Sequence, residues 1–167
     1  MKILSYMSRS WRTLATEALN RTSQVVNFVC LLHVTNTYIV SSTLVYGSSM
    51  LPTLNMSGDV VLAEHVSHRL GKVGHGDVVL VRSPQDPRKI VTKRIVAMEG
   101  DRVPILVDPT TTTHRFPFVE VPKGHVWIQG DNMYSSTDSR HYGPVPYGLI
   151  QGKVFLRVWP PYSFGSL

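Results

Sequence analysis

The sequence predicts a mainly β fold, a compact antiparallel sheet or barrel-like domain that follows one N-terminal transmembrane helix. The β prediction comes from residue 47 onward, where short runs rich in valine and isoleucine are separated by turns of glycine, proline and aspartate. The helix prediction comes from residues 22–58, which contain no Asp, Glu, Lys or Arg. A chain of 167 residues has room for one domain of ordinary size and a short appendage.

Residues 1–23 form a basic N-terminal segment. Four basic side chains stand there against one acidic side chain, which gives a net charge of +3. An acid-poor segment that contains arginine and serine is typical of mitochondrial targeting sequences, and residues 7–20 can form an amphipathic helix. The positive-inside rule predicts that this segment stays on the matrix or cytoplasmic side while the chain after Gly47 crosses the membrane.

Residues 24–46 are the predicted transmembrane helix. About 20 apolar residues are needed to cross a bilayer, and this stretch has that length without a charged side chain. Polar residues in its middle, at positions 33 and 35–37, lower its hydropathy and leave a buried or surface-lying helix as the alternative. The basic segment before it favours the membrane span.

Six strands are predicted after this span, in the runs richest in β-branched residues. They are residues 59–64, 77–82, 90–98, 102–107, 125–129 and 153–159. The segments between them are loop-like, including the proline- and threonine-rich stretch 108–113, and no helix of useful length is expected among them.

Composition excludes several other classes of protein. The formal net charge is +6, but the 13 basic and 10 acidic residues after position 46 are interspersed, so no nucleic-acid-binding surface is predicted. The single cysteine, Cys30, excludes a disulfide within the chain. The spacing of His65, His68 and His75 gives no fixed ligand geometry, so neither a metal nor a cofactor is predicted.

Ser49 and Lys93 are the candidate catalytic pair. A serine hydroxyl is a weak nucleophile until a base takes its proton, and a lysine can be that base once burial has lowered its pKa. Pro52 stiffens the backbone after Ser49. Alternation along the strand 90–98 places three aliphatic side chains on the face of Lys93: Val91, Ile95 and Ala97. The alternatives are a Ser/Gly-rich linker and a surface lysine whose stem lies on the sheet.

A polar loop over residues 130–140 is the second candidate constellation. Its small polar side chains can bond their own backbone, and its hydroxyls can hold a lysine amine in one orientation. Asp138 and Arg140 are close enough in sequence to form an ion pair. The plain alternative is a polar turn that this pair stabilises.

Four sequence boxes together resemble the type I signal peptidases. They occur in that family's order, at residues 49–53 (Ser-Met-Leu-Pro-Thr), 76–79 (Gly-Asp-Val-Val), 93–101 (Lys-Arg to Gly-Asp) and 130–140. The resemblance covers roughly residues 45–159 and implies that residues 47–167 are a serine endopeptidase domain with a Ser/Lys dyad. In it, Ser49 would be the nucleophile and Lys93 the general base.

The resemblance also implies roles for further residues. Ser136 would orient the Lys93 amine, while Asp138 and Arg140 would brace its loop. The Ser49 backbone N–H would donate to the oxyanion. Some relatives carry a second oxyanion donor two residues before the nucleophile, where this chain has Gly47, so the second donor is not identified. The substrate would lie extended beside the dyad, with Met50 and Thr92 as substrate-binding residues.

Within this family, the single span, the compact domain and the tail at 121–167 look most like the subunit 1 branch of the mitochondrial inner membrane proteases. That likeness implies removal of N-terminal targeting or sorting peptides from mitochondrial precursors delivered to the inner membrane or intermembrane space. It implies a single-pass protein of the inner membrane whose catalytic domain faces the intermembrane space, with precursors as substrates, the bilayer as surroundings and a related second catalytic subunit as partner. Three alternatives remain: a thylakoid-type signal peptidase, a self-cleaving regulator with the same dyad, and a non-enzymatic membrane-tethered β-domain that binds partners.

Overall fold

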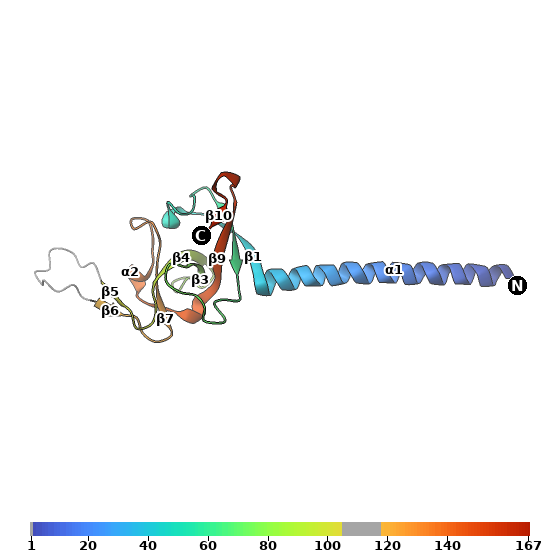
Figure 1. Cartoon of the computed structure of the whole chain (residues 1–167), viewed down its shortest axis with the longest axis horizontal. Coiled ribbons are helices and arrows are strands. Elements are labelled where there is room, and N and C mark those ends of the chain that lie inside the picture. The colour runs from blue at the N-terminus through green and yellow to red at the C-terminus, as the bar shows by residue number, and fades with distance from the viewer. Residues whose placement is uncertain (1, 105–117) are drawn as a thin grey trace, which may run out of the picture. The chain divides into compact units, whose positions relative to one another are not determined.

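The computed structural model describes residues 2–104 and 118–167, with side chains from residue 14 onward. The chain divides into two compact units, Met1–Tyr38 and Ile39–Leu167. The first unit consists of the helix α1 (Lys2–Val34) and most of the π-helical turn η1 (Thr35–Ile39) (Figure 1). The second unit holds all the described strands and is called the β-domain below.

The helix predicted over residues 24–46 does not keep its expected bounds. The α-helix ends at Val34, and the last residues of the expected span form the strand β1 (Val40–Val45) instead. No described helix has a stretch that is both long and apolar enough to cross a membrane. The α-helix ends at Val34 because polar residues at 35–37 interrupt the apolar run there. Valine, serine and threonine then follow, and β-branched residues favour a pleated strand.

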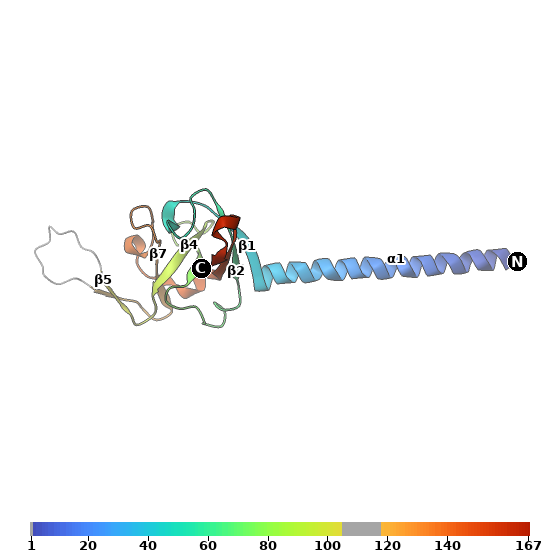
Figure 2. The same cartoon turned by 45° about the horizontal axis from the view of Figure 1, so that its top comes forward.

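The β-domain is built on one eight-stranded antiparallel sheet with the order β1-β2-β9-β3-β4-β7-β8, in which β10 also pairs with β9. Figures 1 and 2 show these strands curling around a shared interior. Besides β1, the sheet contains β2 (Asp59–Glu64), β3 (Val78–Arg82), β4 (Ile90–Ala97), β7 (His125–Gln129), β8 (Val145–Pro146), β9 (Ile150–Trp159) and β10 (Gly165–Ser166). The strands β5 (Arg102–Pro104) and β6 (Phe118–Glu120) form a separate two-stranded ribbon. Short helical turns lie at η2 (Ser48–Met50), α2 (Ser139–Tyr142), η3 (Tyr147–Leu149) and η4 (Pro161–Ser163).

The central strand β3 is buried on both faces. Val79 and Val81 belong to a core cluster that includes Ile95 of β4 and Ile128 of β7. Val78 and Leu80, which alternate with them along β3, belong to a second cluster that also contains Met50 of η2. Because side chains alternate across a strand, one buried strand serves both clusters. The folded sheet thereby brings η2 and β4 together.

The six predicted strands are all present. The predictions 59–64 and 125–129 coincide with β2 and β7, while those at 77–82, 90–98 and 153–159 differ from the observed bounds by one to three residues. Of the prediction 102–107, the first three residues form β5, and 105–107 lie outside the described residues, as does the predicted loop 108–113.

One predicted detail of β4 is wrong. Ala97 does not share the face of Lys93 and Ile95, but packs with Trp127 and Val103 in a third apolar cluster. The physical reason is a register shift between Ile95 and Ala97 in the pairing of β4 with β7. An extra residue in one strand of an antiparallel pair reverses the faces that follow it.

Candidate active site

Ser49 lies in the 3-10 turn η2, which packs against β4. Gly47 precedes this turn with φ at +115°, a conformation that L side chains rarely adopt, so the chain enters the turn through a residue that must be glycine. Asn132 holds the turn from the opposite loop. Its backbone N–H donates to the Ser49 carbonyl at 3.0 Å, and its side-chain amide donates to the Ser48 carbonyl at 3.0 Å.

Lys93 lies in the middle of β4, opposite Val79, with only 3% of its surface exposed. The burial predicted from its aliphatic face is confirmed, which excludes the surface-lysine alternative. Burial lowers the pKa of Lys93 by disfavouring the ammonium form; the Asp138 charge acts against this shift and the Arg140 charge acts with it. The net result is an amine that gives up its proton more readily than an ordinary lysine.

Ser136 connects the lysine to a buried carboxylate. The Lys93 Nζ donates to Ser136 Oγ at 2.8 Å, and Ser136 Oγ donates to Asp138 Oδ2 at 2.6 Å. The Ser136 hydroxyl has one hydrogen, which it donates to Asp138. In its hydrogen bond with the Lys93 amine, the hydroxyl can therefore only be the acceptor. The lone pair of an uncharged Lys93 therefore points away from Ser136 and is left for another proton donor.

Asp138 is itself fully buried and held from several sides. The Nε and Nη2 atoms of Arg140 donate to its two oxygens at 2.8 and 2.6 Å, and the Gly130 N–H donates at 2.9 Å. Burial alone would raise the pKa of Asp138, but these hydrogen bonds outweigh it and leave the pKa well below its usual range. The carboxylate also caps α2 by accepting from the Arg140 N–H. The predicted Asp138–Arg140 pair is thus present and ionised.

Gly130 marks the place where the two constellations meet. A Cβ built on this residue would lie 2.3 Å from Ser136 Oγ and 2.4 Å from the Ser49 carbonyl oxygen. The turn η2 and Ser136 therefore converge on one residue without a side chain. Of the predicted site residues, the structure gathers Ser49, Lys93, Ser136, Asp138 and Arg140 into this region.

A second ion-pair network fastens the same elements and was not predicted as part of the site. Arg94 binds both oxygens of Asp131 at 2.9 and 2.7 Å, and its Nη1 donates to the Gly76 carbonyl at 2.7 Å. Thr53 donates to Asp131 at 2.5 Å. These four residues stand in the four sequence boxes, which is the signal that could have linked them. They tie the chain after η2, strand β4 and the 130–140 loop into one unit.

The two predicted substrate-binding residues are both buried. Met50 is 2% exposed and packs in the core with Leu54 and Val78, and its role in substrate binding stays a prediction. The residue packs inward because η2 turns its apolar side chain under the sheet. Thr92 is 7% exposed and lies opposite Leu80, on the other face of β4 from Lys93, and its role stays a prediction.

Two of the three histidines considered above, His65 and His75, make local hydrogen bonds. His65 bonds the Gln151 carbonyl through Nδ1 at 2.7 Å and the Ser41 hydroxyl through Nε2 at 2.8 Å. His75 bonds Asp101 at 2.6 Å. Among the residues that the structure describes, no group of three His, Cys, Asp or Glu side chains could hold a metal ion.

Comparisons with known proteins extend these observations. The family model described as signal peptidase, peptidase S26, matches residues 18–109 and 104–159. The chain is similar to the mitochondrial ATP-independent inner membrane protease subunit 1a of Arabidopsis thaliana, with 63% identity over 167 residues that cover 100% of this chain and 98% of that protein. The mitochondrial inner membrane protease subunit 1 of Homo sapiens is 39% identical over 142 residues, which cover 85% of this chain and 83% of that protein. A crystal structure of a signal peptidase I from Enterococcus faecalis matches with a TM-score of 0.39 and 20% identity, over 49% of this chain and 96% of that one.

Proposed function

The chain belongs to the signal peptidase family, peptidase S26, and we propose that Ser49 and Lys93 carry out its hydrolysis of peptide bonds. The resemblance to this family inferred from the sequence boxes is confirmed, as is the likeness to the subunit 1 branch of the mitochondrial inner membrane proteases. The chain is therefore a signal-peptidase-type serine protease. The observation that supports the proposed residues most strongly is the burial of Lys93, which is 3% exposed. Its amine is hydrogen-bonded to Ser136, which lies close to the turn that carries Ser49.

The proposed reaction begins when the uncharged Lys93 amine takes the proton of the Ser49 hydroxyl. The alkoxide oxygen attacks the carbonyl carbon of the scissile bond, and the Ser49 N–H donates to the resulting oxyanion. The ammonium then gives its proton to the departing amine, which leaves an acyl-enzyme on Ser49. A water molecule, deprotonated by the same lysine, releases the acyl group and restores the serine.

The surrounding side chains keep this lysine in place. Ser136 accepts one amine hydrogen and directs the lone pair outward, while Asp138 fixes the rotation of the Ser136 hydroxyl. Arg140 keeps Asp138 charged in a site where burial alone would favour its neutral form. Because Gly47 has no hydroxyl, the Ser49 N–H is the one oxyanion donor that the proposal names.

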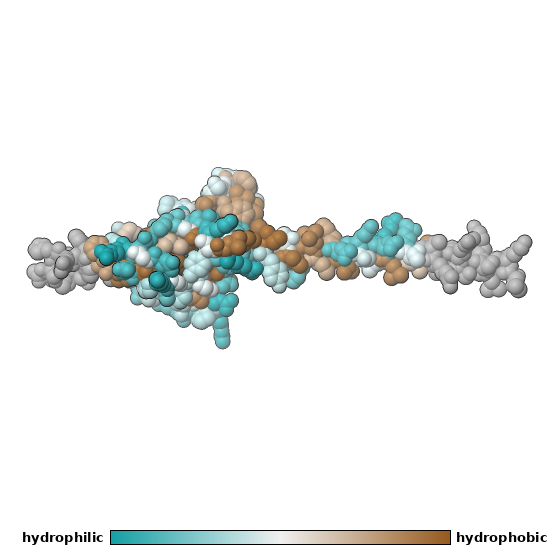
Figure 3. Space-filling model, turned by 60° about the horizontal axis from the view of Figure 1, so that its bottom comes forward, coloured by the Kyte–Doolittle hydropathy of each residue, from teal (hydrophilic) through white to brown (hydrophobic). Residues whose placement is uncertain are grey.

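We assign the chain to the mitochondrial inner membrane on the names of its relatives. The finer proposal is that its N-terminal segment attaches it there by a single crossing and that the β-domain faces the intermembrane space, where it removes N-terminal sorting peptides from precursors. Six large apolar side chains of α1 between residues 25 and 32 are more than half exposed, and apolar residues also reach the surface of the β-domain (Figure 3). Contact with lipid would bury such surface.

A related second catalytic subunit is the proposed partner. Relatives named subunit 1 and subunit 2 of the mitochondrial inner membrane protease both match this chain, the mouse subunit 2 at 41% identity over 127 residues. Two subunits with the same kind of domain could divide the precursors between them by the side chains that they accept next to the cleaved bond.

Substitution of the dyad tests the proposed residues. Ser49→Ala and Lys93→Met should each lower the cleavage rate of a purified mitochondrial precursor about a thousandfold or more, since loss of a nucleophile or its base removes the covalent pathway. Ser42→Ala, at an exposed serine of β1, is the matched control and should cleave at the normal rate. Precursor cleavage by the Ser49→Ala and Lys93→Met variants at the control's rate would overturn the proposal.

A further inference from the structure

A cavity lies on the opposite face of the sheet from Lys93. Its volume is about 710 Å³, within the range of small-molecule sites. It includes Trp127 and Gln129 of β7, which alternate with Val126 and Ile128 of the core beneath Lys93. Neither member of the proposed dyad lines it. The cavity is thus distinct from the dyad itself, and it shares Arg140 with the network that holds Asp138.

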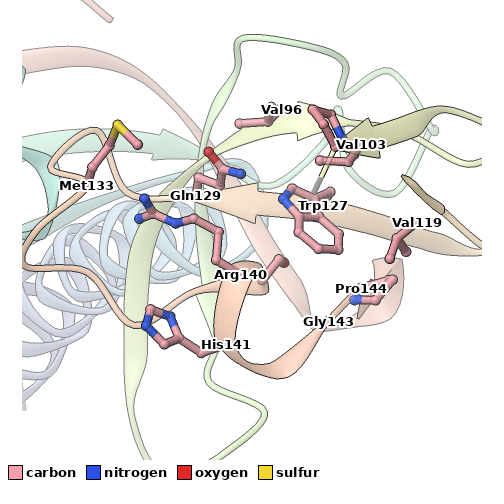
Figure 4. A pocket seen from close by; sticks show the side chains of 12 residues that line it. Val96, Val103, Val119, Trp127, Gln129, Met133, Arg140, His141, Gly143 and Pro144 are labelled. Carbon is pink, nitrogen blue, oxygen red and sulfur yellow. The ribbon is translucent and has the colours of Figure 1, made fainter. Parts of the chain in front are cut away.

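The cavity has an apolar side and a polar side (Figure 4). The apolar side is made by the ring of Trp127 and by aliphatic residues of β4, the β5–β6 ribbon and the segment after α2: Val96, Val103, Pro104, Val119 and Pro144. The polar side is made by Gln129, Arg140 and His141, with Met133 beside them, and it lies across the cavity from Val119 and Pro144. Among its lining residues that the structure describes, none is a carboxylate.

Two hydrogen-bond donors of this cavity have no acceptor within the described residues. Trp127 is 4% exposed, and its buried indole Nε1 has no partner there. Arg140 uses Nε and Nη2 to bind Asp138, which leaves Nη1 without a bond in the same part of the chain. The buried indole of Trp127 has lost water without gaining an acceptor, which costs free energy, whereas Arg140 Nη1 is not among the buried atoms that lack a partner. Both donors would be satisfied by an acceptor at the polar side of the cavity.

From this geometry we propose that the cavity binds an aliphatic carboxylate of the fatty-acid class, with its chain against the β5–β6 ribbon and its carboxylate toward Arg140 and Trp127. A purely apolar ligand would leave the donors unsatisfied. An extended peptide would press polar backbone groups against Val103 and Val119, where they find no partners. A phospholipid offers the same chain and an anionic head, and the experiment below separates the two sources. The inference does not rest on the proposed proteolytic function.

Photolabelling tests the proposal on the full-length chain in phosphatidylcholine nanodiscs. The probe is decanoate with a diazirine at the end of its chain, and mass spectrometry locates the label. We expect label on the residues of β5 and β6, and displacement of the probe by unlabelled decanoate. Val96→Trp fills the cavity and should reduce this label about tenfold. Val66→Trp is the matched control, because Val66 is 42% exposed and Val96 43%, and it should label normally.

The head group is tested with the neutral amide of the same probe, which should label β5 and β6 about tenfold less than the carboxylate does. Equal labelling of wild type and Val96→Trp would overturn the site, and equal labelling by amide and acid would overturn the anionic ligand. Stronger displacement by a monoacyl glycerophosphate than by decanoate would assign the cavity to a phospholipid and overturn the fatty-acid assignment.

Discussion

Lys93 can act as a base only while its amine is uncharged, so its depressed pKa predicts the pH dependence of cleavage. Below the folded-state pKa of Lys93, kcat/KM should rise about tenfold per pH unit, because the fraction of free amine rises at that rate. The rise should level off below pH 10.5, the ordinary value for lysine, since burial lowers the pKa. Initial rates on one precursor between pH 5 and pH 10 measure this profile. A rate that stays flat through the acid range would assign the base to another group.

The same pKa shift predicts how stability depends on pH. Between the folded-state pKa of Lys93 and 10.5, the unfolded chain binds one more proton at this residue, so stability gains from rising pH there. Below that window both states are protonated and the cost of a buried charge is present in full; above it the cost is gone. Lys93→Met should therefore be more stable than wild type by about 1 kcal/mol or more at pH 6, with the difference shrinking toward pH 10.5. Urea unfolding at both pH values measures it, and a destabilised variant at pH 6 would contradict it.

Gly130 is the position at which the smallest added side chain should do the most damage. A methyl group there would collide with Ser136 Oγ and the Ser49 carbonyl, at 2.3 and 2.4 Å. Gly130→Ala should therefore lose about 1–3 kcal/mol of unfolding free energy through overpacking and about a hundredfold or more in cleavage rate through displacement of the dyad. Gly148→Ala is the control, since its Cβ would meet nothing within 4 Å and its φ is not in the left-handed region. The cleavage rate and the free energy of unfolding are measured for both variants. Equal values for Gly130→Ala and Gly148→Ala would contradict the prediction, because the structure would then have accommodated the methyl group at Gly130.

Among the secondary-structure elements, the local sequence pattern was sufficient to predict those strands whose apolar runs are bounded by clear turns. β2 and β7 match their predicted bounds because alternating or continuous apolar runs end at clear turns. β1 could not be found in this way, because an uncharged stretch with valine, serine and threonine fits a membrane helix as well as a strand. What decides it is the pairing of Val40–Val45 with Asp59–Glu64, a contact that no local window contains.

The site was predictable in its residues and less so in its geometry. Alternation along β4 predicted the burial of Lys93, and the sequence boxes predicted that Ser136, Asp138 and Arg140 belong together. The inward position of Met50 depends on how η2 enters the core, which no periodicity records. The faces after Ile95 depend on a register shift that is set by pairing with β7. In both cases tertiary packing supplies information that the local pattern does not contain.

At the scale of the whole molecule, the division into two units suggests that catalysis and attachment can be separated. The β-domain begins at Ile39, whose carbonyl accepts from the His65 N–H, and every described strand lies after it. A chain that starts at Ile39 should therefore fold and cleave a short soluble peptide at close to the full-length rate. A chain that starts at Tyr46 lacks β1 and exposes the β2 edge beside Val61 and Ala63, both 0% exposed. It should lose stability and activity together.

The chain that starts at Ile39 should fail on a substrate that is itself anchored in the membrane. Attachment of enzyme and precursor to one bilayer raises their effective concentration, a gain of about 10²–10⁴ in favourable geometries. Without residues 1–38, processing of a membrane-anchored precursor in liposomes should fall by about a hundredfold or more, while cleavage of the soluble peptide is retained. Alkaline carbonate should extract the truncated chain and leave the full-length chain in the membrane pellet. If the truncated chain processed the anchored precursor at the full rate, α1 would contribute nothing to catalysis at the membrane, and the β-domain would have to reach the bilayer through its own surface.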